Sequence, residues 1–203
     1  MGIVFGVTGV AEPAWRQIST SSRNYEVRYL PSSVAAHVQS GNGDGAFPIL
    51  AGYIGVTSKA KNDKQQSISM TAPVVQTPNT RQEFESKQMA MAFMLPTSFA
   101  AVGDCPTPND DRVKLEMKPG KIVAVKSFSG WCSETTVRRN FEQLLEAVQQ
   151  DGLVESATAR DHEWELAQYN PPFTIPQFRR NEIWLSLAHD MTEAAIVEKL
   201  SSS

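Results

Sequence analysis

The sequence predicts a single α+β domain built from two related halves. The order strand, helix, strand, long loop, strand occurs twice, first over about residues 33–95 and again over about residues 121–187. In each copy one run has the periodicity of a helix, and the other apolar runs are short and mostly alternate, as strands do. The long loops 76–87 and 170–181 occupy corresponding places. We therefore expect antiparallel strands with two helices packed outside them.

Composition supports one domain with a substantial core. The chain has 203 residues, of which 41% are hydrophobic, and its net charge of −3 combines acidic and basic residues. This balance gives no reason to expect nucleic acid or an anionic membrane as a partner. No apolar run approaches the ~20 residues that span a bilayer, and residues 1–10 lack the pattern of a secretory signal. Cys105 and Cys132 provide neither a disulfide framework nor a zinc site, so we expect a reducing, cytoplasmic location.

Two strands open the first half, after a lead-in over residues 1–24. Residues 25–29 and 34–38 alternate between apolar and polar positions, and Pro31 separates them. A cluster of turn-forming residues follows at 40–45.

A helix is expected next, with Asp44 as its N-cap and Gly55 at its end. Pro48 falls in the first turn, where a missing N–H does no harm. The apolar stripe at helical spacing is Phe47, Leu50, Ala51 and Ile54. Two further strands are expected over residues 67–75 and 88–95. The second is apolar on both faces, which is typical of a buried strand or one that lines a cavity.

The second half opens on a predicted hairpin. Its strands, 113–117 and 122–128, flank Pro119 and Gly120. Ser133 is then the expected N-cap of the clearest helix in the chain. The apolar stripe of that helix is Val137, Phe141, Leu144, Leu145 and Val148, and Gly152 ends it.

A long loop over residues 170–181 lies between predicted strands at 164–169 and 182–187. Its three prolines exclude helix and central strand. Its large apolar residues, Phe173, Ile175 and Phe178, are costly to leave in water. The loop either packs over the end of the core or forms the rim of an apolar ligand pocket.

Motifs of common enzyme classes are absent from the sequence. It has no glycine-rich phosphate loop, no G-x-S-x-G elbow, no H-E-x-x-H and no C-x-x-C. Phosphoryl transfer, α/β-hydrolase chemistry and zinc catalysis are therefore poorly supported, and no catalytic residue is assigned.

Several segments resemble the SOUL family of haem-binding proteins. The segments YNPPF (169–173) and RRNEIWL (179–185) resemble the C-terminal signature of that family. Further matching segments are YEVRYLPSSVAAHV (25–38), DGAFPILAGYIG (44–55), ISMTAPV (68–74) and MAFMLP (91–96). The opening MGIVFG resembles the start of the plant and algal cytosolic-type members. The resemblance implies a distorted antiparallel β-barrel with two flanking helices over residues 25–188. Residues 189–203 are expected to be a frayed helix or a disordered tail.

The resemblance also implies non-covalent binding of haem or another tetrapyrrole, by a carrier, buffer or chaperone. Two other classes stay open, namely an enzyme that turns over or modifies a bound tetrapyrrole and a protein-interaction module that uses the loop. In the family the pocket lies between the first helix and the loop that joins the last two strands. The corresponding residues here, with two methionines from the strands, are Phe47, Leu50, Ala51, Ile54, Met70, Met91, Phe173, Ile175, Pro176, Phe178, Arg179 and Arg180.

Several of these residues also have plainer interpretations. Methionine adapts to flat aromatic ligands, but Met70 and Met91 equally suit ordinary core filling. Arg179 and Arg180 could form bidentate bonds with propionates, or belong to a solvated turn in which Arg180 pairs with Glu182.

No iron ligand is named from the sequence. Tyr29 stands where some animal relatives have histidine, so histidine ligation there does not carry over. His37 is either a haem ligand or a partly exposed strand residue. Asp44 replaces a basic residue of the animal relatives, and Phe47 and Ala51 replace methionines. A propionate partner would therefore have to be Arg179, Arg180 or Lys59.

Overall fold

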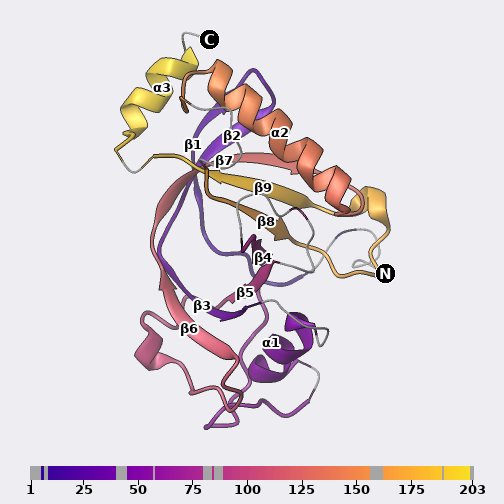
Figure 1. The fold of residues 1–203 in the computed structure, drawn as a ribbon. Coiled ribbons are helices and arrows are strands. Elements are labelled where there is room, and N and C mark those ends of the chain that lie inside the picture. The colour runs from indigo at the N-terminus through magenta and orange to yellow at the C-terminus, as the bar shows by residue number, and fades with distance from the viewer. Residues whose placement is uncertain are drawn as a thin grey trace.

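The computed structural model describes residues 6, 9–39, 45–56, 58–79, 84, 89–155, 162–188 and 190–201. Within this part of the chain, nine strands form one sheet in the order β1-β2-β7-β9-β8-β4-β5-β3-β6. The strands are β1 (Arg16–Ser21), β2 (Tyr25–Leu30), β3 (Ser33–Val38), β4 (Val74–Thr77), β5 (Ala90–Met94), β6 (Val113–Lys118), β7 (Lys121–Phe128), β8 (Trp164–Gln168) and β9 (Asn181–Ser186). The helices are α1 (Ala46–Ile54), α2 (Glu134–Gln150) and α3 (Glu193–Ser201), with short 3-10 turns η3 (Val102–Asp104) and η5 (Pro176–Phe178) (Figure 1).

The sheet confirms the predicted antiparallel α+β architecture, but it is open. Every strand pair in it is antiparallel. β1 and β6 lie at the two ends of the strand order and do not pair with each other in the described part of the chain. The sheet is therefore not closed, and the expected distorted barrel is not confirmed.

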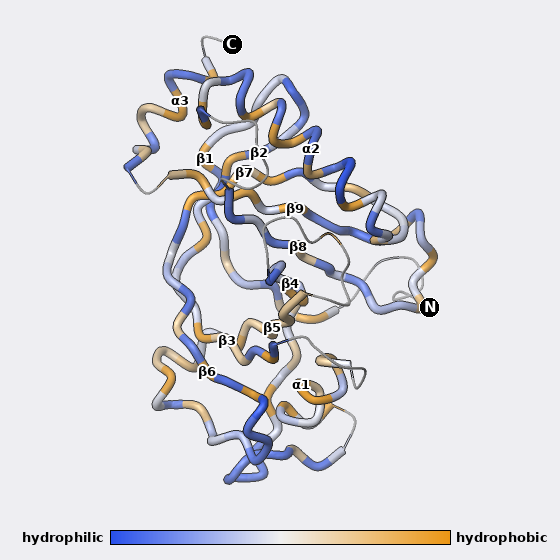
Figure 2. The backbone as a smooth tube through the Cα atoms, viewed as in Figure 1, coloured by the Kyte–Doolittle hydropathy of each residue, from blue (hydrophilic) through white to orange (hydrophobic). Residues whose placement is uncertain are grey.

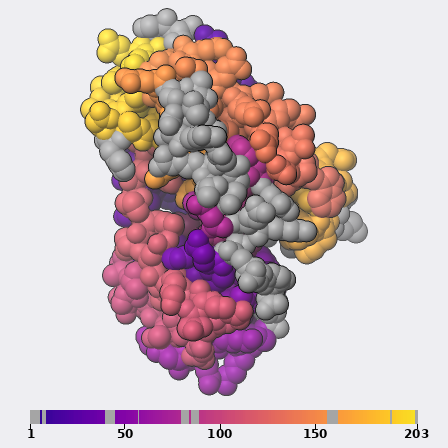
Figure 3. Space-filling model, in the orientation of Figure 1, coloured from indigo at the N-terminus to yellow at the C-terminus, as the bar shows by residue number. Residues whose placement is uncertain are grey.

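The order β3-α1-β4-β5 is repeated as β7-α2-β8-β9, as the sequence predicts. The two copies meet at the centre of the sheet, where β4 pairs with β8. Figure 3 shows them as a lower and an upper lobe. The strand that precedes each copy pairs with the other copy: β2 pairs with β7 of the second, and β6 pairs with β3 of the first.

The predicted hairpin at Pro119 and Gly120 is wrong. β6 and β7 do not pair with each other; they follow one another as two parts of a long bent strand opposite β2 and β3. The pairings Leu30↔Lys121 and Ser33↔Lys118 keep the same register across the bend. A Cβ at position 120 would lie 2.6 Å from the Tyr29 hydroxyl, so glycine at this position leaves room for that side chain. The residues that suggest a turn therefore bend the strand instead of reversing it.

Helix α2 and its core follow the sequence prediction. The Ser133 side chain accepts a hydrogen bond from the Thr136 backbone N–H at 3.2 Å and so caps the helix. Gly152, just past the end, has φ of +69°, a conformation that glycine adopts at little cost. The predicted apolar stripe of α2 is buried against β7 and β9. Figure 2 shows hydrophobic positions recurring along α2 between hydrophilic ones.

The first half departs from the prediction in two places. Helix α1 begins at Ala46 with Gly45 as its N-cap and no side-chain cap, so the predicted cap at Asp44, itself outside the described residues, is wrong. The helix ends at Gly55 as predicted, with φ of +82°. The strand expected over residues 67–75 is confined to β4, Val74–Thr77, after Pro73, whose missing N–H limits pairing.

Both ends of the described chain are more ordered than expected. β1 falls inside the predicted lead-in and pairs with β2. The C-terminal segment takes the helical alternative as α3, which packs on β1 and fully buries Ile196. An ion pair between Arg16 and Glu193 joins the two elements. These two segments stabilise each other, which neither sequence pattern shows alone.

Candidate functional site

The apolar stripe predicted for the pocket wall on α1 is mostly core. Leu50 and Ile54 are buried among residues of β3 and β5, and Ala51 is buried as well. Only Phe47 of this stripe reaches the surface, with 39% of the residue exposed, and its ring meets the Phe93 ring at 5.3 Å, edge to face. Side chains without exposed surface cannot touch a ligand unless the helix moves.

The two methionines predicted for the pocket belong to this same cluster. Met70 and Met91 are partly buried and pack against it. The structure thus brings the α1 stripe and the methionines together, in the lower half of the molecule (Figure 1).

The loop between β8 and β9 presents its aromatic residues to solvent. Phe173 is 66% exposed and Phe178 is 43% exposed, while Ile175 and Pro176 are partly buried. Pro176 begins the short turn η5, where its missing N–H does no harm. The loop is anchored to the connection before α2, because the Gly130 N–H donates to the Pro176 carbonyl at 2.9 Å.

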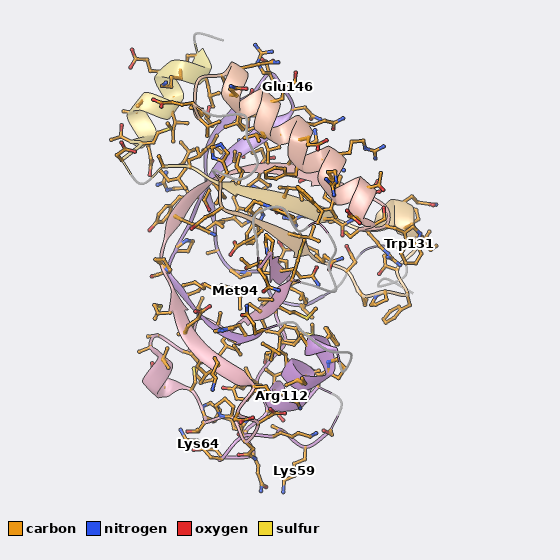
Figure 4. All side chains as sticks on the ribbon, in the orientation of Figure 1. Lys59, Lys64, Met94, Arg112, Trp131 and Glu146 are labelled. Carbon is orange, nitrogen blue, oxygen red and sulfur yellow. The ribbon has the colours of Figure 1, made fainter. Side chains whose placement is uncertain are left out.

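An exposed tryptophan on that connection contacts the loop through Arg179. Trp131 is 61% exposed, and the Arg179 guanidinium lies over its ring, 3.9 Å from the centroid. The same guanidinium donates to the carbonyls of Thr174 and Pro172 and so braces the loop. We call Trp131, Phe173, Phe178 and Arg179 the loop patch. Trp131, labelled in Figure 4, was not among the residues predicted for the site.

The structure does not bring the loop and α1 together within the described part of the chain. α1 packs on β3, β5 and β6. The loop lies beside the N-terminal end of α2, away from α1 (Figure 1). That the α1 residues and the loop residues line one pocket therefore stays a prediction.

The second predicted arginine has a structural role. Arg180 pairs with Glu182 at 2.9 Å and with Glu12 at 3.0 Å. Its guanidinium also lies 3.7 Å from the centroid of the Tyr169 ring. The sequence left two roles open for Arg180, a bond to a propionate or a pairing with Glu182, and the structure shows the pairing with Glu182.

A buried carboxylate is the centre of the polar network to which Arg180 belongs. Glu182 has no exposed surface. Its oxygens accept hydrogen bonds from Arg28 at 3.1 and 3.2 Å, from the Tyr169 hydroxyl at 2.8 Å and from the Trp184 indole N–H at 2.8 Å. Burial acts to raise the pKa of Glu182, but Arg28, the Trp184 bond and Arg180 outweigh it and lower the pKa. Glu182 is therefore ionised and fixes two aromatic side chains.

Those aromatic side chains line a cleft of about 460 Å³ on the sheet face opposite the helices. Along β9, Ile183 and Leu185 point into the core beneath α2, whereas Trp184 and Ser186 line the cleft. Its apolar lining also includes Leu30, Val75 and Met94, of which Met94 is labelled in Figure 4. None of the residues predicted for the pocket lines this cleft.

Residues 12–15 of the lead-in form one side of the cleft. The Ala72 N–H donates to the Ala11 carbonyl at 2.9 Å. Glu12 reaches Arg180, and the Arg28 guanidinium lies 4.0 Å from the centroid of the Trp15 ring. The sequence alone does not reveal the cleft, because the described residues that line it come from seven separate segments of the chain. The one available signal was that Glu182, Trp184 and Ser186 fall on the same face of a strand.

The histidines give no evidence for an iron ligand. His37, on β3, has its Nδ1 3.3 Å from a Glu116 oxygen. His162 is partly buried, and His189 lies outside the described residues. No group of three or more potential metal ligands occurs within the residues that the structure places.

The cysteines give no sign of a reactive thiol. Burial raises the pKa of Cys132 to about 11, despite its place before α2. Burial likewise raises the pKa of Cys105. Separately, no helix in the described ranges is both long and apolar enough to cross a membrane.

Comparison with known proteins gives a family match over most of the chain. A family model described as "SOUL heme-binding protein" matches residues 10–186. Heme-binding protein 1 of Mus musculus is 32% identical over 142 residues, which cover 69% of this chain and 68% of the relative. Heme-binding protein 2 of Homo sapiens is 29% identical over 198 residues, which cover 91% and 89%.

Solved structures with little sequence identity share the fold. An uncharacterised conserved protein from Listeria innocua has a TM-score of 0.54 at 14% identity, over 83% of this chain and 94% of that one. The EcmrR C-terminal domain has a TM-score of 0.51 at 12% identity, over 81% and 97%. These likenesses concern the fold alone.

Proposed function

This chain belongs to the SOUL heme-binding protein family, and from that membership we propose that it binds haem or another tetrapyrrole non-covalently. The observation that carries the proposal is the family match, which spans residues 10–186 and therefore all nine strands of the sheet and both repeated helices. We propose a carrier or buffer role in the cytoplasm, and membership of the plant and algal cytosolic type from the opening MGIVFG.

We propose the loop patch as the main contact for the tetrapyrrole. Exposed aromatic groups that lie together commonly mark a binding surface. The ring of a tetrapyrrole is flat and apolar, so it can cover Phe173 and Phe178 and remove their exposed surface from water. Its propionates carry negative charge, and Arg179 supplies a guanidinium in the same patch.

The other predicted residues support this proposal in different ways. Phe47 is the exposed member of the α1 set, and because α1 lies away from the loop patch it would reach the same ligand only if the two moved together, while Leu50 and Ile54 hold its helix on the sheet. Ile175 and Pro176 are partly buried residues of the same loop, and Pro176 begins its short turn η5. Arg180 is committed to Glu12 and Glu182, so it would act through the position of the loop.

Replacing Phe173 with alanine should weaken tetrapyrrole binding without much effect on stability. A large apolar side chain buried against a ligand contributes up to about 1.5–3 kcal/mol of binding free energy. In the free protein the residue is 66% exposed, so its loss should change the free energy of unfolding by about 0.5 kcal/mol or less. Absorbance titration and urea unfolding of the same variant measure both quantities.

Val197→Ala, at an exposed site on α3, is the matched control and should leave affinity unchanged. Unchanged affinity with a large loss of stability in Phe173→Ala would show that the loop is structural only.

Replacing His37 with alanine should leave haem affinity within a few-fold of the original. His37 lies on β3, and its imidazole faces Glu116. The loop patch, by contrast, belongs to the segments around β9 and α2. Titration with haem, with circular dichroism to confirm folding, measures the effect. A loss of about tenfold or more, equivalent to ~1.4 kcal/mol, in a folded variant would identify His37 as a ligand.

The alternative functions can be tested on the same complex. A carrier leaves the Soret band of bound haem intact during aerobic incubation with a reductant, whereas an enzyme that degrades haem bleaches it. An interaction module would bind no tetrapyrrole and would retain a protein partner through the loop patch.

A further inference from the structure

The cleft on the sheet face opposite the helices shares no described residue with the loop patch. Its volume of about 460 Å³ falls within the range of ~300–1,000 Å³ that is usual for small-molecule pockets. The contacts proposed for the tetrapyrrole leave this space unused. The cleft is therefore a candidate for a binding site of its own.

The bend in the sheet builds one wall of this cleft. Two paired segments of the chain change direction together, where β2 leads into β3 and where β6 leads into β7. Residues of both bends line the cleft, including Leu30 and Pro31 on the first and Pro119 on the second. Because proline fixes the φ angle of its own residue, Pro31 and Pro119 stiffen this wall. A wall that is fixed before binding loses little conformational freedom when a ligand enters.

Apolar side chains from four strands line the cleft. Val75 and Trp184 belong to a buried cluster on this face of the sheet, and Leu30 and Met94 pack against that cluster. Leu30 and Met94 are only partly buried, so they keep apolar surface open in the cleft. A ligand that covers this surface removes it from water, which favours binding of apolar molecules.

The charged residues in the described lining already have partners. Three ion pairs, at 3.0, 2.8 and 2.6 Å, join Glu12 with Arg180, Glu165 with Lys121, and Lys118 with Glu116. Glu163 is engaged as well. The guanidinium groups of Arg28 and Arg180 already lie over the rings of Trp15 and Tyr169. A charged ligand would have to displace one of these partners or stay unpaired, and a buried charge without a partner is costly.

We propose that this cleft is a second binding site, for an uncharged and largely apolar small molecule. Such a ligand covers the surface of Leu30 and Met94 and leaves every ion pair of the lining intact. The hydroxyl groups of Ser33 and Thr77 also line the cleft, and a hydroxyl both donates and accepts hydrogen bonds. The ligand can therefore carry one uncharged polar group. This proposal is independent of the tetrapyrrole function.

Two fluorescent probes with the same ring system and different charge test the proposal. N-phenyl-1-naphthylamine is uncharged at pH 7, and 8-anilino-1-naphthalenesulfonate is the same molecule with an added sulfonate. The fluorescence of both rises when they leave water for an apolar site. Titration should show saturable binding of the uncharged probe, at least about tenfold tighter than that of the anion. Equal affinities, or no saturable binding of the uncharged probe, would overturn the proposal.

Two substitutions on different strands then locate the uncharged probe. Ser186 on β9 and Ser33 on β3 are partly buried and line the cleft, so phenylalanine at either position fills part of it. Ser186→Phe and Ser33→Phe should each weaken binding at least about tenfold. Circular dichroism confirms folding, and if one variant does not fold, the other carries the test. Unchanged binding in a folded cleft variant would show that the probe binds elsewhere.

Controls separate the cleft from the loop patch. Ser98→Phe makes the same substitution at an exposed serine outside the cleft and should leave binding of the uncharged probe unchanged. Phe173→Ala, in the loop patch, should also leave it unchanged. Ser186→Phe and Ser33→Phe should in turn keep the haem affinity of the original protein, and a parallel loss of haem binding would contradict two separate sites.

Discussion

Replacing Glu182 with alanine should lower the free energy of unfolding by about 3–5 kcal/mol, because it leaves buried cationic and polar groups without their acceptor. Arg28 is itself buried and reaches both Glu182 oxygens at 3.1–3.2 Å. The Tyr169 hydroxyl and the Trp184 indole lose their acceptor in the same substitution. Urea unfolding followed by circular dichroism measures the change.

A second glutamate beside Arg28 provides the matched control. Glu26 pairs with Arg28 at 2.8 Å but has a partly exposed side chain. Glu26→Ala should therefore cost no more than about 1 kcal/mol, the usual range for exposed ion pairs. An equal loss of free energy of unfolding in Glu182→Ala and Glu26→Ala would contradict the stabilising role that we assign to the buried network.

Replacing Trp164 with alanine should cost about 3–5 kcal/mol through the cavity that it leaves. Trp164 is fully buried between the sheet and α2. Its ring centroid lies 5.1 Å from the Phe84 centroid and 5.1 Å from the Phe141 centroid. Phe141 is held on α2, which packs on the sheet, so the space can close only in part.

The control for this substitution is the exposed tryptophan of the loop patch. Trp131→Ala removes the same side chain from a position that is 61% exposed, and it should cost less than about 1 kcal/mol. A melting temperature that fell equally in both variants would mean that the rings around Trp164 repack completely.

The parts of the fold that the sequence predicts are those set by local pattern. The stripe from Val137 to Val148 has helical spacing and lies on α2, and Ser133 caps that helix through its own side chain. The packing of α3 on β1 and the bend at Pro119 depend on partners far along the chain. The ion pair of Arg16 with Glu193, and the pairing of Lys118 with Ser33, cannot be read from one segment alone.

The candidate site shows the same difference between features set by local pattern and features set by distant contacts. Proline content and large apolar groups predict an irregular loop with Phe173 and Phe178, and the structure exposes both. The same apolar character does not reveal that Leu50 and Ile54 are fully enclosed, because helical spacing shows which residues share a face and not what covers it. The network around Glu182 requires contacts between β2, β8 and β9, so only the folded chain shows it.

The central claim is that the protein binds a tetrapyrrole mainly through apolar contact. Parallel titration of the purified protein with haem and with iron-free protoporphyrin, followed by absorbance, tests it most directly. Apolar contact with the loop patch does not depend on iron, so we expect saturable binding of both with affinities that differ by less than about tenfold, or ~1.4 kcal/mol. Saturable binding of haem alone would show that an iron ligand dominates, and no saturable binding of either would contradict the proposed function.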